Sequence, residues 1–314
     1  MQTIHGYDRL GPEQRGAVIA LGNFDGVHLG HRAVLDIARR LAGDGDAKLG
    51  LALFDPHPRR YFAPDARTFR LMSPARRDAT LAGLGITQLH VLEFDAAMAK
   101  MSPEMFVQTV LADGLGIAGI ATGSDFRFGA GRAGSTVELA QLCAERGIRS
   151  DFAELKGNGS DKVSSTRIRK AILDGNMQAA AELLGARWTV DGIVAQGNQR
   201  GRTIGFPTAN IDMGDYVRPA YGVYAVLVGI DGEPARRAAV ANIGTRPTVD
   251  GVTEVLEVHL LDFEGDLYGR ELAVEFHDHL RAEHRFDGLD ALKAQIALDA
   301  TRARDVLMRV AGPA

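Results

Sequence analysis

The pattern of short apolar runs along the chain changes once, near residue 186. Before that point, short apolar runs alternate with helical patterns. The apolar runs cover residues 17–21, 49–54, 88–94, 117–122 and 150–155. The helical patterns cover residues 31–42, 74–83, 103–113 and 135–147. Strands that alternate with helices favour a parallel sheet with helices on both faces. We therefore predict an α/β domain over residues 1–186, which ends with two helices at 165–173 and 176–184.

After residue 187 the apolar runs are closely spaced and turns separate them. The expected strands cover residues 188–195, 206–211, 221–231, 235–243, 254–263 and 271–280. Asp231-Gly232 and Asp250-Gly251 are turn signals between them. Closely spaced strands joined by turns predict a barrel or a sandwich over residues 187–314. A last helix is expected at 288–310, with apolar residues from Leu289 to Val310 on one face.

Composition excludes several classes of protein. The 314 residues are 46% apolar and 24% charged, which is typical of a globular protein, and the net charge is −4. The basic residues are spread along the chain, which argues against a nucleic-acid partner. One cysteine, Cys143, permits no intrachain disulfide, and its apolar neighbours indicate a packing role. Without an apolar run of membrane-span length or a signal-peptide core, we expect a cytoplasmic enzyme or binding protein with no membrane partner.

Residues 22–31 read Gly-Asn-Phe-Asp-Gly-Val-His-Leu-Gly-His and join an apolar run to a helical pattern. The three glycines permit positive φ and a close approach of the backbone to a ligand. A helix start offers N–H groups and the positive end of a dipole to phosphate. His28 and His31 lie three apart, so one helical turn presents both imidazoles on one side. We interpret this segment as a phosphate-binding turn whose histidines stabilise charge on a nucleotide triphosphate, although such histidines are also common as polar surface. Neither a Walker A nor a Rossmann glycine pattern occurs at this position.

Two other loops follow strands of the same expected sheet. Residues 55–58 read Asp-Pro-His-Pro, and residues 123–129 read Gly-Ser-Asp-Phe-Arg-Phe-Gly. Ligands of open α/β sheets bind beyond the carboxyl ends of the strands, where these loops lie. Ser124 or Asp125 is placed to contact a ribose or a base. Phe126 and Phe128 either stack on a flat ring or anchor the loop.

Residues 164–169, Ser-Ser-Thr-Arg-Ile-Arg, open a further helix. Ser165 or Thr166 can cap this helix, which is the simpler interpretation. The helix start with Arg167 beside it, helped by Lys162, is also suited to hold a triphosphate.

The second half carries its own glycine-rich, basic loop at residues 197–205, followed by Phe-Pro-Thr-Ala-Asn at 206–210. Backbone N–H groups of such a loop can cradle phosphates. Thr208 and Asn210 are two apart on a strand and face the same way, and their oxygens suit Mg²⁺ already held by phosphates. A flexible hairpin before an ordinary strand is the alternative.

A carboxylate on an expected strand, Glu257, shares its strand face with Val255, His259 and Leu261. A carboxylate among inward apolar neighbours is costly unless it is paired or used, so we interpret Glu257 as a proton acceptor, with a salt bridge as the alternative. Another set, Glu275, His277 and His279, imitates a metal site, but an exposed polar face is the favoured interpretation.

Taken together, these motifs resemble the bacterial bifunctional riboflavin kinase/FAD synthetase family. The resemblance covers roughly residues 15 to 310, and its motifs occur in the family's order at residues 22–31, 54–58, 123–129, 164–169, 201–210, 241–247 and 256–263.

For the first domain, the resemblance implies a Rossmann-like nucleotidyltransferase that joins AMP from ATP to FMN, giving FAD and pyrophosphate. Its catalytic residues would be His28 and His31, which stabilise the transition state. ATP would bind at Gly22, Asn23, Phe24, Asp25, His28, His31, Asp125, Ser164, Thr166 and Arg167. The flavin pocket would include Phe62 and Phe128.

For the second domain, the resemblance implies a riboflavin kinase with a six-stranded antiparallel β-barrel and a terminal helix. Glu257 would be the general base, and Thr208 and Asn210 would hold Mg²⁺. ATP would bind at Gly201, Arg202, Thr203, Gly205, Pro207, Thr208 and Asn210. The flavin would be bordered by residues 242–247 and by the 262–270 turn, including Asp262, Tyr268 and Arg270. The turn at 196–199 is less acidic than the family pattern, so nucleotide affinity is expected to differ.

The leading hypothesis is therefore an enzyme that makes FMN and then FAD from riboflavin and ATP. An enzyme with one surviving activity, a non-catalytic flavin sensor and a tRNA-related ligase are the other candidates. Both sets of site residues are present, which argues against the first two, and the charge balance argues against the third. The sequence leaves the oligomeric state open.

Overall fold

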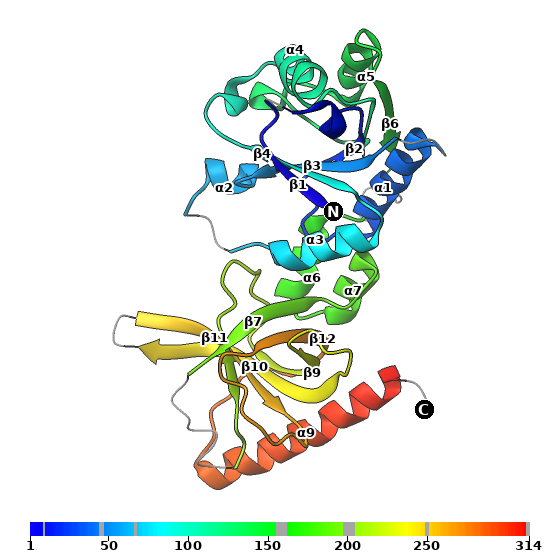
Figure 1. Cartoon of the computed structure of the whole chain (residues 1–314). Helices are drawn as coiled ribbons and strands as arrows, with labels where there is room; N and C mark the ends of the chain where they lie inside the picture. Colours follow the sequence, from blue (N-terminus) through cyan, green and yellow to red (C-terminus); the bar gives the residue numbers. More distant parts are fainter. Residues whose placement is uncertain are drawn as a thin grey trace. The chain divides into compact units, whose positions relative to one another are not determined.

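The computed structural model describes residues 1–8, 10–43, 47–65, 68–154, 162–196, 205–248 and 251–311. The chain divides into two compact units (Figure 1). Unit 1 comprises Met1–Arg67 and Pro74–Ser164, and unit 2 comprises Thr68–Ser73 and Ser165–Ala314. None of the described helices is long and apolar enough to cross a membrane.

Unit 1 is built on a six-stranded parallel sheet with the order β1-β4-β3-β2-β5-β6. Its strands are β1 Gln2–His5, β2 Val18–Leu21, β3 Leu49–Asp55, β4 Gln88–Glu93, β5 Gly119–Gly123 and β6 Arg149–Ala153. Five of these strands were predicted. The edge strand β1 was not predicted because only Ile4 in it is buried, which leaves no apolar run to read.

Helices cover both faces of this sheet, as predicted. They are α1 Leu29–Ala42, α2 Pro58–Phe62, α3 Pro74–Gly83, α4 Pro103–Met105 and α5 Thr136–Ala144, with the short 3-10 turns η1 Pro12–Gln14, η2 Met98–Lys100 and η4 Ala130–Arg132. Ile19 packs in one cluster with Phe106 and Leu139. The helix α1 contacts β2 and β5 on the other face, and Figure 1 shows α1 and α3 opposite α4 and α5. Cys143 lies in the Ile19 cluster, and burial raises its pKa to about 11, which confirms its packing role.

The helix expected at 103–113 continues from α4 as a π-helix, η3 Phe106–Leu115. Gly116, with φ 57°, ends it in the left-handed conformation. The Arg15 guanidinium donates hydrogen bonds to the carbonyls of Asp113 at 3.0 Å and Gly114 at 2.7 Å. A cation thus binds carbonyls that the helix end leaves without partners.

Unit 2 is a closed barrel with the strand order β10-β11-β8-β7-β12-β9, and all its pairs are antiparallel. The strands are β7 Thr189–Ala195, β8 Ala209–Ile211, β9 Gly222–Ile230, β10 Arg237–Thr248, β11 Gly251–Leu260 and β12 Glu271–Arg281. Buried residues such as Val190, Val226, Leu256 and Val258 fill the interior. The barrel prediction is confirmed, although β8 is shorter than the expected strand at 206–211.

Among its described residues, unit 2 also has the helices α6 Ser165–Leu173, α7 Met177–Leu184 and α9 Leu289–Ala311. Ile168 and Met177 belong to the same core cluster as Trp188, so α6 and α7 pack with the barrel. The helix α9 lies on β9 and β10 through Ala300, Ala303 and Leu307. Its predicted apolar stripe is only partly buried, since the Leu289 side chain is 54% exposed.

Candidate functional site

The loop after β2 lies where the strand order of unit 1 reverses. From β2 the chain builds outward to β3 and β4, and then returns to place β5 on the other side of β2. Loops that leave β2 and β5 therefore diverge, and this is where open α/β sheets bind ligands. The predicted phosphate-binding turn at residues 22–31 occupies this position.

The two predicted histidines of this turn lie against each other. The His28 side chain caps α1, because its Nδ1 accepts a hydrogen bond from the His31 N–H at 3.2 Å. The two imidazole rings stack with centroids 3.6 Å apart and planes 12° apart. The Phe24 ring stacks on the other side of His31, with centroids 4.6 Å apart. The pairing expected from the helical spacing is confirmed, and Phe24 fixes the orientation of the His31 ring.

Only one of the three turn glycines adopts positive φ, namely Gly26 at 88°. The expectation of positive φ is wrong for Gly22 and Gly30, where a side chain would instead come too close to neighbouring atoms. A Cβ on Gly30 would lie 3.2 Å from the His28 ring and 3.3 Å from the Val163 carbonyl oxygen. Val27 has φ 41°, a conformation that a β-branched residue adopts only under strain. Strained backbone of this kind is typical of binding sites.

Asn23 and Asp25 lie in the same turn, both partly buried. The Asn23 side-chain oxygen is buried and accepts no hydrogen bond within the described part of the chain. An unsatisfied acceptor in this turn suits a ligand that brings a donor.

In the loop after β5, Asp125 is exposed to solvent while Phe126 and Phe128 are half-buried and buried. Asp125 is exposed and forms an ion pair with Lys162. Phe128 is 6% exposed, and it stacks on the half-buried Phe126 with centroids 5.9 Å apart. Phe128 belongs to the same core cluster as Phe106.

Phe62, the other predicted flavin-pocket residue, is 68% exposed. Its ring meets Phe94 edge-on at 5.7 Å, and Phe94 meets Phe54 at 5.6 Å. Phe106 then connects Phe54 to Phe128, at 6.2 Å and 5.7 Å between ring centroids. The two predicted residues are thus ends of one row of aromatic rings, exposed at Phe62 and buried at Phe128.

The predicted triphosphate residues 164, 166 and 167 fall on both sides of the boundary between the units. Ser164 ends unit 1, next to the Val163 carbonyl that lies close to Gly30. Thr166 is exposed and Arg167 is partly buried in the first turn of α6, in unit 2.

In unit 2 the barrel brings Asn210 and Glu257 directly opposite each other on β8 and β11. Their neighbours Ala209, Leu256 and Val258 point into the barrel, so Asn210 and Glu257 point outward on a shared face. The expectation that Glu257 lies among inward apolar neighbours is wrong, because the residues of β11 that face the barrel interior are Leu256, Val258 and Leu260.

On the strand that flanks β11 opposite β8, namely β10, Asn242 pairs with Glu257. Three polar side chains, Asn210, Glu257 and Asn242, therefore form a row across three strands. Sequence reasoning assigned Asn242 to the flavin border and missed its pairing with Glu257, because register is not visible in a single strand.

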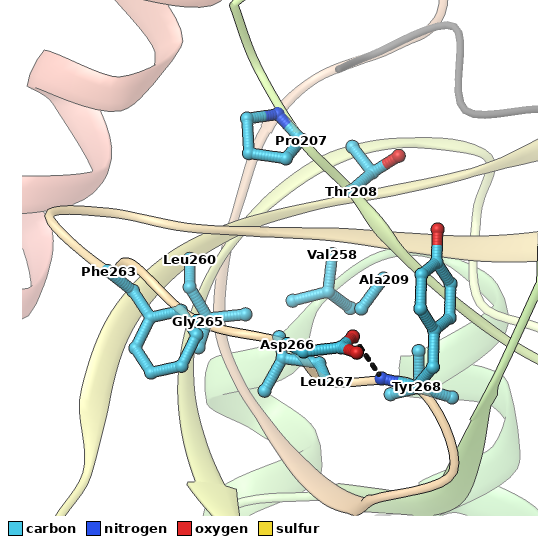
Figure 2. A pocket seen from close by; sticks show the side chains of 11 residues that line it. Pro207, Thr208, Ala209, Val258, Leu260, Phe263, Gly265, Asp266, Leu267 and Tyr268 are labelled. Carbon is cyan, nitrogen blue, oxygen red and sulfur yellow. Dashed lines mark hydrogen bonds between the residues drawn. The ribbon is translucent and has the colours of Figure 1, made fainter.

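A pocket opens at one end of the barrel, and inward-facing residues such as Val258 and Leu260 line part of it (Figure 2). It is lined by Val194, Pro207, Thr208, Ala209, Val258, Leu260, Phe263, Gly265, Asp266, Leu267 and Tyr268. Figure 2 shows Tyr268 and Asp266 on one loop, with the Tyr268 N–H donating to the Asp266 carboxylate at 3.1 Å. Thr208 and Tyr268 thus border one cavity, and four more of its lining residues come from the 262–270 turn that was expected to border the flavin: Phe263, Gly265, Asp266 and Leu267.

Two residues expected to border the flavin, Arg270 and Asp262, form ion pairs or hydrogen bonds with other side chains. Arg270 forms ion pairs with Asp231 at 2.7 Å and Glu233 at 3.3 Å. The hydrogen bond from Arg270 lowers the pKa of Asp231, and the same bond raises the pKa of Arg270. Asp262 accepts from Arg304 at 2.9 Å.

The glycine-rich loop is described only at its end. Gly205 is exposed with φ 89°. Gly201, Arg202 and Thr203 lie outside the described residues.

Glu275, His277 and His279 do not form the exposed polar face that was favoured. His277 is 4% exposed, and its Nε2 lies 2.8 Å from a Glu275 carboxylate oxygen. This hydrogen bond lowers the pKa of Glu275. Within the described ranges, no group of three or more His, Cys, Asp or Glu side chains could hold a metal ion.

Comparison with known proteins divides the chain in the same order as its motifs. A family model described as FAD synthetase matches residues 11–167, and one described as riboflavin kinase matches residues 184–307.

Relatives named bifunctional riboflavin kinase/FMN adenylyltransferase align with nearly the whole chain. The one from Pseudomonas fluorescens is 41% identical over 305 residues and the one from Escherichia coli (strain K12) is 40% identical over 307 residues, each covering 97% of both chains. The one from Bacillus subtilis (strain 168) is 34% identical over 312 residues, covering 96% of this chain and 97% of its own. A crystal structure described as a macrolide-efflux protein from Streptococcus pneumoniae superposes with a TM-score of 0.85 at 31% identity, covering 96% of this chain and 98% of that one.

Proposed function

The chain belongs to the bifunctional riboflavin kinase/FMN adenylyltransferase family, and we propose that its two reactions take place at two separate sites, one in each half of the chain. The family matches confirm the resemblance that the motifs indicated. The enzyme phosphorylates riboflavin with ATP to give FMN, and it adenylylates FMN to give FAD and pyrophosphate. We assign the second reaction to residues 1–186 and the first to residues 187–314, in the order of the matched family models.

Adenylyl transfer is assigned to the turn after β2. The FMN phosphate attacks the α-phosphorus of ATP, and the bond to pyrophosphate breaks, so no nucleophile from the protein is required. The stacked pair of His28 and His31 supports this assignment, since it lies at the start of α1 where the helix dipole also favours negative charge. These imidazoles hold the triphosphate and stabilise the charge that develops on the leaving pyrophosphate.

Asp125 and Ser164, both in unit 1, belong to the ATP site in this proposal. Asp125 holds the nucleoside portion, and Ser164 binds phosphate oxygens. Phe62 offers an exposed aromatic face for the flavin ring, and Phe128 supports that face from the core.

Phosphoryl transfer is assigned to the outward row on the barrel. The riboflavin 5′-hydroxyl attacks the γ-phosphorus, Glu257 accepts the hydroxyl proton, and ADP leaves. The register that sets Asn210 opposite Glu257 is the observation that supports this assignment most directly.

Thr208 and Asn210 also fit a Mg²⁺ ion that arrives with ATP. A hydroxyl and an amide oxygen are hard, neutral donors, and they leave the remaining positions to phosphate oxygens and water. Bound with ATP, Mg²⁺ would neutralise charge on the phosphate oxygens. The two residues would keep the ATP phosphates on the face that carries Glu257. We place the enzyme in the cytoplasm, where ATP is available to both reactions.

Two substitutions test whether the sites are separate. Glu257→Gln removes the proton acceptor, so FMN formation from riboflavin should fall by about 10²- to 10⁴-fold, while FAD formation from supplied FMN persists. His28→Ala should give the opposite result. Chromatography of riboflavin, FMN and FAD measures both reactions in one sample.

Exposed residues of the same types provide controls: Glu271→Gln on β12 and His5→Ala on β1 should leave both reactions unchanged. If each site substitution abolished both reactions in a folded protein, the assignment of two sites would be wrong.

A further inference from the structure

The hydrogen-bond ladder between β8 and β11 stops one residue before the nucleotide-binding Thr208. The last paired residues are Ala209 and Val258. Pro207 has no N–H and cannot extend the ladder. The segment that carries Thr208 therefore needs another attachment to the barrel.

His259 provides that attachment. Its Nδ1 lies 2.8 Å from the carbonyl oxygen of Pro207. A carbonyl oxygen only accepts, so Nδ1 carries the hydrogen and donates it. The ring also meets Phe206 edge-on, with centroids 5.5 Å apart and planes 78° apart. One side chain thus contacts both residues that precede Thr208.

We propose that His259 is a positioning residue of the riboflavin kinase site, which holds Pro207 so that Thr208 faces the phosphates and the Glu257 carboxylate at the same time. This inference rests on the proposed function of Thr208 and Glu257. Glu257 and His259 are two apart on β11 and share its outward face. A hydrogen bond from His259 therefore couples the Thr208 segment to the strand that carries the base. Figure 2 shows Pro207 and Thr208 at the edge of the pocket, where a displaced backbone would alter the nucleotide contacts.

Three substitutions at His259 separate the hydrogen bond from the bulk of the ring. Asn places an amide N–H near the position of Nδ1, Gln places it farther along the side chain, and Leu has no donor. His259→Leu should raise KM for ATP in riboflavin phosphorylation about five- to tenfold, the size expected for one lost hydrogen bond, with kcat changed less. His259→Asn should stay within about twofold of the native KM, and His259→Gln should resemble Leu. Adenylylation of supplied FMN should be unchanged in all three and reports that each variant is folded.

A measurement on the native protein checks the same bond without any substitution. Nitrogen-15 NMR of labelled histidine should show that Nδ1 of His259 is protonated at neutral pH. A ring protonated only at Nε2 would overturn the proposal, whether or not the variants fold.

The kinetic outcomes are equally decisive. An unchanged KM for ATP in His259→Leu, or equal impairment of the Asn and Leu variants, would reject the positioning role while leaving the kinase assignment intact. A native enzyme that makes no FMN from riboflavin would instead reject the proposed function itself.

Discussion

His90 on β4 is a buried histidine that neither proposed site uses. Its side chain is 1% exposed, and neither ring nitrogen has a hydrogen-bond partner among the described residues. Burial lowers the pKa of His90 from 6.5 to about 4. The folded state therefore keeps the ring neutral where the unfolded chain already binds a proton.

This difference makes unit 1 sensitive to acid. As the pH falls from 6.5 to 4, the unfolded state gains a proton that the folded state excludes, and the free energy of unfolding should fall by about 3 kcal/mol. His90→Leu should remove that part of the pH dependence, as measured by urea unfolding at a series of pH values. His5→Gln, which removes an exposed histidine, should retain it. An identical pH dependence in His90→Leu and the native protein would contradict the prediction.

Among the elements, α9 is joined to the barrel by the ion pair of Asp299 and Arg281 as well as by its apolar contacts with β9 and β10. Asp299 is 2% exposed and accepts two hydrogen bonds from the Arg281 Nε, at 3.1 and 3.0 Å, and one from Nη2, at 2.8 Å. Gln295 donates a further bond to the same carboxylate at 2.8 Å. A buried carboxylate with this many partners fixes the rotation of α9 on β12.

Removing the Asp299 carboxylate should leave the partly buried Arg281 guanidinium without its anionic partner. Asp299→Ala should therefore lower the free energy of unfolding by about 3–5 kcal/mol in denaturant titrations. Asp305→Ala, at an exposed position of the same helix, is the matched control and should change stability by less than about 0.5 kcal/mol. A loss of similar size in both variants would show that the ion pair contributes nothing specific.

At the scale of the whole molecule, our proposal of two separate sites implies that FMN can pass between different copies of the enzyme. Glu257→Gln should make almost no FMN from riboflavin, and His28→Ala should stop at FMN. A mixture of the two variants with riboflavin and ATP should nevertheless produce FAD, because FMN released by one variant is a substrate for the other. Chromatography of the mixture measures this directly. Absence of FAD, with each variant keeping its remaining reaction, would show that FMN does not leave the chain that makes it.

The order and type of the elements were predictable because hydrophobic periodicity is a local property of the chain. The pairing of His28 with His31 was predictable for the same reason, since an N-cap side chain and the residue three positions later meet at the start of any helix. The edge strand β1 and the early end of the ladder at Pro207 were missed. The strand β1 was missed because only one of its side chains is buried. The end of the ladder was missed because the effect of a proline depends on the strand that lies beside it.

Local pattern along the chain is enough to show that an α/β half precedes a β half, and which residue types could handle phosphate in each. The closed barrel is needed to show that Glu257 faces outward between Asn210 and Asn242, because alternation along a strand defines two faces and the barrel selects which is inside. Tertiary contacts also show that Gly30 is needed for the space beside His28 and that His259 holds Pro207. These contacts join residues far apart in the chain, and their geometry follows from strand register and packing rather than from local pattern.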